Sequence, residues 1–139
     1  MKTYQPKEKE VKRNWHLIDA KGEIVGRLAT KVSELLMGKL KATFSKHMDM
    51  GDYVVLLNAE KVKFSGRKED DKLYRRHSGF PGGYREITAK LMREKFPDRI
   101  IKKAVFGMLP NNRQRNERMK RLKIIIGSKN TFEDKFKEN

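Results

Sequence analysis

The chain has 139 residues, a formal net charge of +16 and a pI of about 10.1, and it contains no cysteine. This length suits a single domain with its own core. The lack of cysteine excludes disulfides and thiolate metal sites. No apolar run approaches the roughly 18 residues of a membrane-spanning helix. Such a high positive charge opposes compaction unless a polyanion neutralises it, so we expect a nucleic-acid partner.

The chain begins with polar residues 1–13, which show no periodicity and which we expect to form an extended basic arm. Residues 14–20 follow as a predicted strand. A short turn at residues 21–23 leads to a predicted helix over residues 25–36, where apolar side chains recur at helical spacing. Gly38 stands where the C-terminal cap of that helix belongs. Strand, turn and helix in this order indicate the opening of a βαβ unit.

Residues 52–58 form a near-continuous apolar run of strand length. A strand that is apolar on both faces is typical of a parallel sheet covered on both sides. Residues 61–64 can add a short extension to this strand. Residues 65–85 are rich in glycine and charge, which predicts a long loop, although residues 74–77 within it can pair as a short strand.

The pattern of residues 88–96 predicts a helix that ends before Pro97. Pro97 suits the first turn of a second helix that follows. Residues 122–126 are a candidate for a buried strand. We expect the last segment, residues 128–139, to be an irregular tail. The order of elements predicts an α/β sandwich with a mainly parallel sheet, in one domain over residues 14–127.

A basic segment connects the second of these helices to the last strand. Six basic residues lie between residues 113 and 123, against the single acid Glu117. A solvated helix normally alternates charges to gain ion pairs between neighbouring turns, so this imbalance favours contact with a polyanion. We predict that this segment contacts RNA through Arg113, Arg115, Arg118, Lys120 and Arg121.

The glycine-rich loop interleaves basic residues with Tyr74, Phe80 and Tyr84. These aromatic side chains suit stacking on bases, but packing beneath the loop as a small satellite cluster is an equally good interpretation. His77 suits either a contact with RNA or a plain surface position. The predicted RNA contacts of the loop region are Arg67, Arg75, Arg76, His77 and Arg85.

The turn that leads into the first helix carries Gly22 and Gly26, as phosphate-cradling loops do. It lacks the third glycine of a dinucleotide motif and the lysine of a P-loop, so a simple turn between strand and helix is the alternative. Arg27, just inside the helix, is well placed for an RNA phosphate in either case. A second predicted group of RNA contacts therefore comprises Arg27, Lys39, Lys41 and Lys46.

Catalytic chemistry has little support in the sequence. The acids that follow predicted strands and turns have no histidine or nucleophile at a defensible spacing, which favours capping and ion pairing over catalysis. The three histidines are far apart and form no metal-ligand spacing, so we expect neither a metal nor a cofactor. The acids in question are Asp19, Asp49, Asp52 and Glu60.

Several stretches together resemble the large-subunit ribosomal protein thirteen family in its bacterial form. They occur in the family's order between Asn14 and Gly127, and the GMLP segment is the most specific of them. The stretches are WHLIDAKGEIVGRLATKVSELLMGK, GDYVVLLNAEKVKFSGRK, KLYRRHSGFPGGYRE, AVFGMLPNN and RLKIIIG. Three features depart from the family pattern: NNRQRNER after GMLP, the ending SKNTFEDKFKEN, and Phe106 where a basic residue is common.

The resemblance implies a three-layer α/β/α sandwich with a four-stranded, mainly parallel sheet. It also implies a structural constituent of the large ribosomal subunit that binds 23S-type rRNA early in assembly and contributes to translation without catalysis. Neighbouring large-subunit proteins are then the other partners, with no membrane contact and no functional homo-oligomer. The expected location is the cytoplasm, with an organellar ribosome as the alternative.

A rival hypothesis is a small nucleotide- or RNA-processing enzyme that uses the first strand-to-helix turn as its phosphate site. The incomplete phosphate loop and the lack of a credible general base disfavour it.

Overall fold

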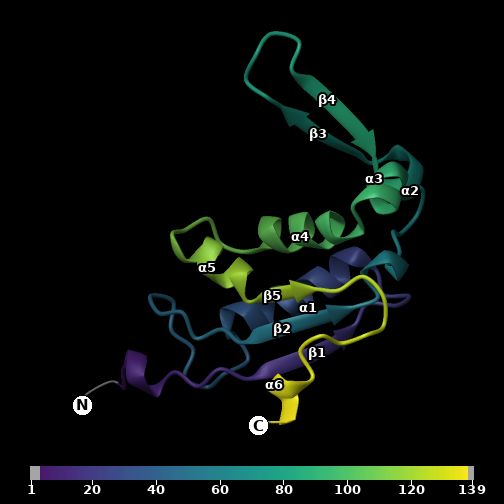
Figure 1. Cartoon of the computed structure of the whole chain (residues 1–139). Helices are drawn as coiled ribbons and strands as arrows, with labels where there is room; N and C mark the ends of the chain where they lie inside the picture. The colour runs from purple at the N-terminus through teal and green to yellow at the C-terminus, as the bar shows by residue number, and fades with distance from the viewer. Residues whose placement is uncertain (1–3, 138–139) are drawn as a thin grey trace.

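The computed structural model describes residues 4–137; residues 1–3 and 138–139, the outer ends of the expected arm and tail, lie outside the described residues. Within them, the main sheet is parallel and has the strand order β1-β2-β5 (Figure 1). Its strands are β1 (Trp15–Asp19), β2 (Tyr53–Leu57) and β5 (Leu122–Ile124). A separate antiparallel pair is formed by β3 (Leu73–His77) and β4 (Tyr84–Thr88).

The helices of the described residues lie between and after these strands. They are α1 (Val25–Met37), α2 (Lys68–Asp71), α3 (Ala89–Lys95), α4 (Pro97–Met108), α5 (Gln114–Lys120) and α6 (Asp134–Lys137), with short 3-10 turns at η1 (Glu8–Glu10) and η2 (Ala59–Lys61). No helix within residues 4–137 combines the length and the apolar character needed to cross a membrane.

The expected α/β fold with a parallel sheet is confirmed, but the four-stranded sheet is not. Three strands pair in the main sheet of the described residues. The proposed extension at residues 61–64 contributes only an isolated bridge between Ile24 and Lys63. The strand expected at residues 74–77 is present, yet it pairs with residues 84–88 to form a hairpin apart from the main sheet.

Helix α1 forms because apolar side chains recur every three or four residues along one face. Val25, Leu28, Val32 and Leu36 are all buried on that face. The helix ends at Gly38, which adopts a left-handed conformation with φ of 75° and donates its N–H to the carbonyl oxygens of Glu34 and Leu35. The prediction for this element is therefore confirmed, including its cap.

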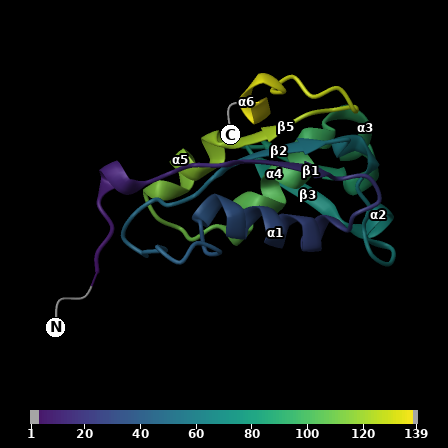
Figure 2. The same cartoon turned by 90° about the horizontal axis from the view of Figure 1, so that it is seen from below.

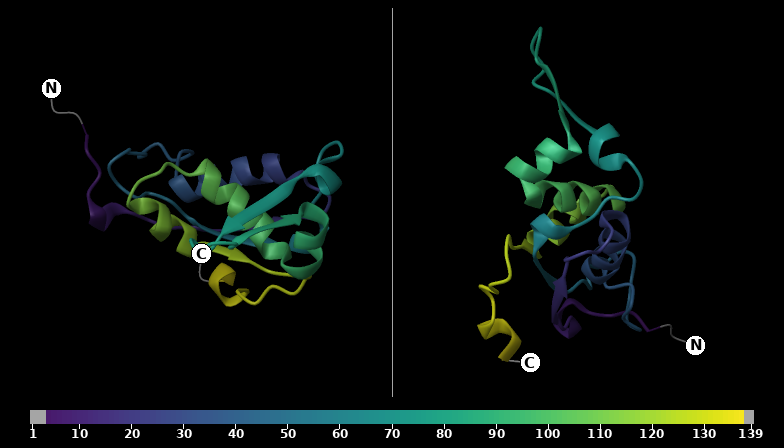
Figure 3. Two further views of the ribbon diagram at one scale, coloured as in Figure 1. Left: turned by 90° about the horizontal axis from the view of Figure 1, so that it is seen from above. Right: turned by 90° about the vertical axis from the view of Figure 1, so that its right-hand side faces the viewer.

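The core lies between α1, α4 and one face of the sheet (Figure 3). Val54 and Leu56 of β2 point into this core and are fully buried. Val55 points to the opposite face because side chains alternate along a strand, and it is fully buried as well. Both faces of β2 are thus covered, as the continuous apolar run predicted.

The C-terminal segment differs from the irregular tail that we expected. It carries the short helix α6, which lies beside the sheet (Figure 2). The ring of Trp15 stacks on Tyr53 with centroids 4.4 Å apart, and Phe132 and Phe136 contact the same indole at 5.9 and 6.1 Å. Aromatic burial therefore orders a segment that local propensity leaves undecided.

Replacing Val105 by alanine tests the core. The Val105 side chain, on α4, is fully buried in the core. Removing its two methyl groups should lower the free energy of unfolding by about 2 kcal/mol, because their burial is lost and a cavity remains. Denaturant unfolding measures this change, with the exposed Lys102→Ala variant as control. Equal stability of the two variants would contradict this arrangement of the core.

Candidate nucleic-acid interface

The β3–β4 hairpin projects away from the body of the molecule (Figure 1). Arg75, Arg76, His77 and Arg85, all predicted as RNA contacts, are exposed on it. Their one ion pair among the described residues is a long contact of 3.9 Å between Arg75 Nε and a carboxylate oxygen of Glu86. The hairpin therefore presents almost all of its positive charge to the solvent.

The aromatic residues of the hairpin divide between the two interpretations. Tyr74 is half-buried, and the ammonium groups of Lys72 and Lys103 lie 5.4 and 5.2 Å from its ring centroid. Burial raises the pKa of the Tyr74 phenol. Phe80, at the tip, is 75% exposed. The interpretation that these rings pack beneath the loop is therefore confirmed for Tyr74 and wrong for Phe80. Phe80 is free to stack on a base.

His77 helps to shape the tip of the hairpin. Its Nδ1 accepts a hydrogen bond of 2.9 Å from the backbone N–H of Gly79. Gly79 and Gly82 have φ values of 88° and 72°, a region that glycine occupies without strain. These two glycines allow the chain to reverse between the strands. The ring of His77 remains exposed beside Arg76.

A groove of about 590 Å³ separates the hairpin from α3 and α4. Basic residues of the hairpin line one side, and three basic residues that the sequence interpretation missed line the other. Glu86 is the one acid among its lining residues. The missed residues are Lys95, Arg99 and Lys103. Their spacing of four residues indicates that they share one side of the helical segment, and this pattern could have identified them.

Arg118 and Arg121, both predicted as RNA contacts, are instead buried around the carboxylate of Asp49. Arg121 donates two hydrogen bonds to Asp49, of 2.5 and 2.6 Å, and a third of 3.1 Å to the carbonyl oxygen of Leu36. The Nε of Arg118 lies 3.5 Å from the same carboxylate, and its Nη2 donates to Gln114. Neither side chain reaches the solvent, so we withdraw both as RNA contacts.

The same carboxylate anchors the end of the N-terminal arm. Arg13 donates to the carbonyl oxygens of Gly51 and Asp49, and its Nη2 lies 3.7 Å from the Asp49 carboxylate. Gly51 is required here, because a Cβ atom would lie 1.7 Å from the carbonyl oxygen of Leu36. The segment after α1 can therefore approach the end of that helix only with glycine at this position.

Lys41 also has a structural partner. Its ammonium group donates to the buried carboxylate of Asp52, at 2.5 Å, and to the carbonyl oxygen of Lys12. Asp52 further accepts the backbone N–H of Asn14 and lies 2.9 Å from Nε2 of His16. Sequence spacing gave no sign of the His16 partner, because residues 36 positions apart meet across the sheet. The arrangement fixes the start of β1 beside β2.

The pKa values of both aspartates reflect these partners. Burial alone raises the pKa of Asp49, but hydrogen bonds and charge from Arg121, together with the charge of Arg13, outweigh it and lower the pKa. Burial likewise acts to raise the pKa of Asp52, and the bonds from Lys41, Asn14 and His16 reverse that effect. Both groups are therefore held as carboxylates in the folded protein.

The remaining predicted residues lie at the surface. Arg115 is half-buried, with its guanidinium 4.2 Å from the ring centroid of Phe106 and a hydrogen bond to the carbonyl oxygen of Leu109. Lys120 is exposed and paired with Glu117 at 2.7 Å. The other exposed residues are Arg27, Lys39, Lys46, Arg67 and Arg113.

The two main groups do not form one patch. Helix α5 follows the C-terminal end of α4, whereas the hairpin lies near its N-terminal end (Figure 1). Among the described residues, no cluster of three or more histidine and acidic side chains is arranged to bind a metal ion. The fold and the exposed cations together define a strongly basic α/β protein.

The comparisons with known proteins identify the family. The model of the family described as ribosomal protein L13 matches residues 13–131, and the chain belongs to this family. The large ribosomal subunit protein uL13 of Chloroflexus aggregans is 50% identical over 127 residues, which cover 91% of this chain and 89% of that protein.

Two further relatives agree with this assignment. The uL13 proteins of Clostridioides difficile and Maridesulfovibrio salexigens are 47% and 48% identical, and the alignments cover 94% and 92% of this chain and 92% and 90% of those proteins. The family resemblance seen in the sequence is confirmed. The chain is a ribosomal protein and not an enzyme, so the rival enzymatic hypothesis is set aside.

Comparing Arg121→Ala with Arg113→Ala tests whether the buried arginine stabilises the fold and the exposed one does not. Arg121→Ala leaves the carboxylate of Asp49 without its bidentate partner in a largely buried site. We expect a loss of roughly 3 kcal/mol in the free energy of unfolding. Arg113→Ala removes the same charge from the surface, and it should cost less than about 0.5 kcal/mol. Similar denaturation midpoints for the two variants would contradict the structural role of Arg121.

The lowered pKa of Asp49 predicts a loss of stability in acid. A carboxyl group whose pKa falls on folding contributes stability that is complete above its unfolded value, near 3.8, and is lost as the pH falls through the lower folded value. The Asp49→Asn variant cannot titrate. Its free energy of unfolding should therefore change less between pH 6 and pH 3 than that of the wild type. Parallel pH profiles in denaturant unfolding would show that Asp49 is not the titrating group.

Proposed function

We propose that the protein is a structural constituent of the large ribosomal subunit that binds 23S-type rRNA through its exposed basic side chains. The relatives are named as large-subunit proteins, and the high net charge of this chain calls for a polyanionic partner. The protein would act in the cytoplasm, as one copy beside neighbouring ribosomal proteins, and it would contribute to translation without catalysis.

The observation that carries this proposal is the composition of the β3–β4 hairpin. A two-stranded hairpin is marginally stable in water unless other elements support it. Here the strands are largely exposed and lie outside the main sheet. The exposed side chains include three arginines and His77 against the single acid Glu86, with Phe80 at the tip. A surface of this kind gains most from phosphates along its sides and from an unpaired base at its end.

The proposed contacts follow the exposure of each side chain. The hairpin supplies the principal group, and the surface of α5 and the region around α1 supply two smaller ones. Arg115 takes part through the edge of its guanidinium that Phe106 leaves open. The proposed RNA contacts are Arg75, Arg76, His77 and Arg85; Arg113, Arg115 and Lys120; and Arg27, Lys39, Lys46 and Arg67.

We also propose that the protein binds early in subunit assembly, through a domain over residues 14–127. The core formed by α1, α4 and the sheet is closed within the described chain. A domain with its own core can bind rRNA before neighbouring proteins are present. Residues 1–13 would then be an arm anchored at its end by Arg13. Reconstitution of subunits from purified components tests this order, because omitting the protein should block early intermediates.

Charge removal from the hairpin tests the RNA-binding proposal. The variant Arg75→Gln, Arg76→Gln, Arg85→Gln should bind a 23S rRNA fragment at least tenfold more weakly at moderate salt, because phosphate contacts are lost. The slope of log affinity against log salt should fall by about 2 to 3, taking RNA to behave like DNA. Filter binding across 50–200 mM salt measures both quantities.

The matched control removes three charges elsewhere on the surface. Lys9→Gln, Lys90→Gln and Lys102→Gln alter exposed lysines outside the proposed contacts. This variant should change affinity less than threefold. If both triple variants lose affinity equally, net charge alone governs binding and the hairpin has no special part. If the wild type shows no salt-dependent binding to any rRNA fragment, the proposed function fails.

A further inference from the structure

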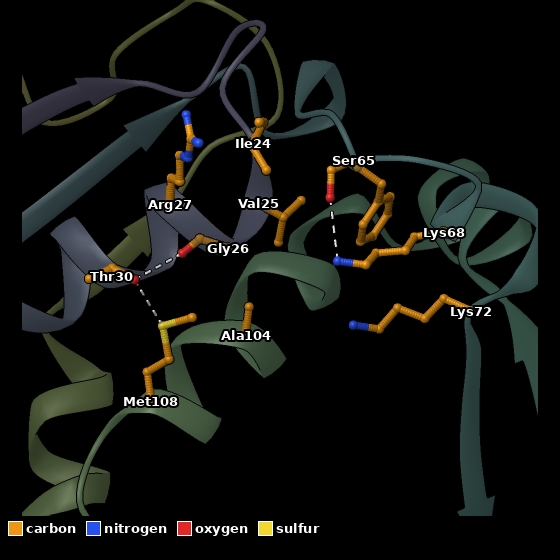
Figure 4. Close-up of a pocket in the computed structure, with 11 residues that line it drawn as sticks. Ile24, Val25, Gly26, Arg27, Thr30, Ser65, Lys68, Lys72, Ala104 and Met108 are labelled. Atoms are coloured by element: carbon orange, nitrogen blue, oxygen red, sulfur yellow. Dashed lines mark hydrogen bonds between the residues drawn. The ribbon is translucent and has the colours of Figure 1, made fainter.

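A second cavity lies beside the start of α1, which follows the carboxyl end of β1, and beside Lys72, which directly precedes β3 of the hairpin. It has a volume of about 550 Å³, and its walls come from the start of α1, the segment after η2, helix α2 and helix α4 (Figure 4). In open α/β folds, small ligands are commonly bound beyond the carboxyl ends of the strands. The volume is within the range of pockets that bind small molecules.

Two lysines line this cavity from α2 and its C-terminal end. Lys68 and Lys72 are four residues apart, and Figure 4 shows the two side chains, both of which line the cavity and are exposed, extending side by side in the same direction. Lys68 Nζ lies 3.3 Å from the hydroxyl oxygen of Ser65. Arg27 lines the rim and points away from the two lysines.

No carboxylate neutralises these lysines. The lining contains no acid, and neither Lys68 nor Lys72 has an ion pair among residues 4–137. Helix α2 carries three acids of its own, but none of them lines the cavity, and Glu69 is paired with Arg93 at 3.1 Å. Like charges that line one cavity repel one another, and a bound anion relieves that repulsion.

Much of the remaining cavity lining is apolar. Val25, Phe64, Ala104 and Met108 supply its walls. Phe64 is held in place by Arg93 and Lys72, whose charged groups lie 5.6 and 5.8 Å from its ring centroid. An inorganic anion would use only the lysines. The lining as a whole therefore matches a ligand that joins an anionic group to a flat apolar one.

We propose that this cavity binds a nucleotide, with its phosphate on Lys68 and Lys72 and its base against Phe64 and the adjoining apolar wall. The same chemistry comes either from an unpaired nucleotide of bound RNA or from a free nucleoside phosphate. The first source rests on the proposed rRNA binding, and the second does not. The site requires no chemistry beyond binding.

The first experiment uses free nucleotide and the full chain. Equilibrium dialysis with ATP at 150 mM salt compares the wild type with Lys68→Gln, Lys72→Gln and with the control Lys90→Gln, Lys102→Gln. The control removes equal charge from exposed positions outside the cavity. A free-nucleotide site predicts at least tenfold weaker binding in the first variant and less than twofold in the control. Lys68→Arg with Lys72→Arg should retain binding because the charges remain.

The second experiment uses RNA. The same variants are compared for binding to a 23S rRNA fragment, and ultraviolet crosslinking locates the contacted peptide. An RNA-borne nucleotide predicts a crosslink at Phe64 and at least a fivefold loss of affinity in the cavity variant alone. Circular dichroism checks that each variant is folded.

The outcomes separate the proposals. Loss of ATP binding in the cavity variant alone supports a site for a free nucleotide. Loss of RNA binding in the cavity variant alone supports a site for a nucleotide of bound RNA. Equal behaviour of the cavity and control variants in both experiments overturns it. Competition against ATP by inorganic phosphate as effective as that by AMP also overturns it, because the base would then contribute nothing. If the wild type binds no rRNA, the proposed function fails, while the ATP experiment still decides the cavity.

Discussion

The carboxylate of Asp49 is the contact on which the arrangement of the other segments depends. It joins Arg121, at the entry to β5, to Arg118 on α5 and to Arg13 before β1, while Arg121 also holds the carbonyl oxygen at the end of α1. Arg13, Asp49 and the pair Arg118 and Arg121 come from three segments far apart in the chain, so local propensity cannot bring them together. One acid in a chain with a large excess of cations thereby sets where the helices and strands end relative to one another.

Periodicity predicted the elements whose burial is regular. Helix α1 with its glycine cap and the apolar strand β2 match the sequence patterns closely, because one face or both faces pack against the core. Strand β4 was missed, since Tyr84–Thr88 carries exposed and charged residues and shows no apolar alternation. The fourth strand of the main sheet was expected from the family resemblance alone.

The sequence predicted which cationic side chains are exposed only in part, because opposite charges can meet from distant parts of the chain. Counting cations identifies a surplus but not its location, because a buried arginine and an exposed one are identical in sequence. Arg118 and Arg121 were misplaced since their partner, Asp49, lies 69 and 72 positions away. The hairpin arginines are exposed, because the surrounding sequence is rich in glycine and poor in apolar residues, which leaves a side chain no core to enter. Their contact with RNA stays a prediction.

The structure divides its cations into two populations by whether an acid is within reach. The first population forms ion pairs with Asp49 and Asp52 that connect the segments of the domain; it comprises Arg13, Lys41, Arg118 and Arg121. The hairpin arginines meet at most one distant carboxylate, and the cavity lysines meet none among the described residues. Since 18 acids cannot neutralise 34 basic residues, the second population must be balanced from outside. Phosphates would supply that charge, so the same imbalance that weakens the isolated chain is the physical basis for the RNA binding that we propose.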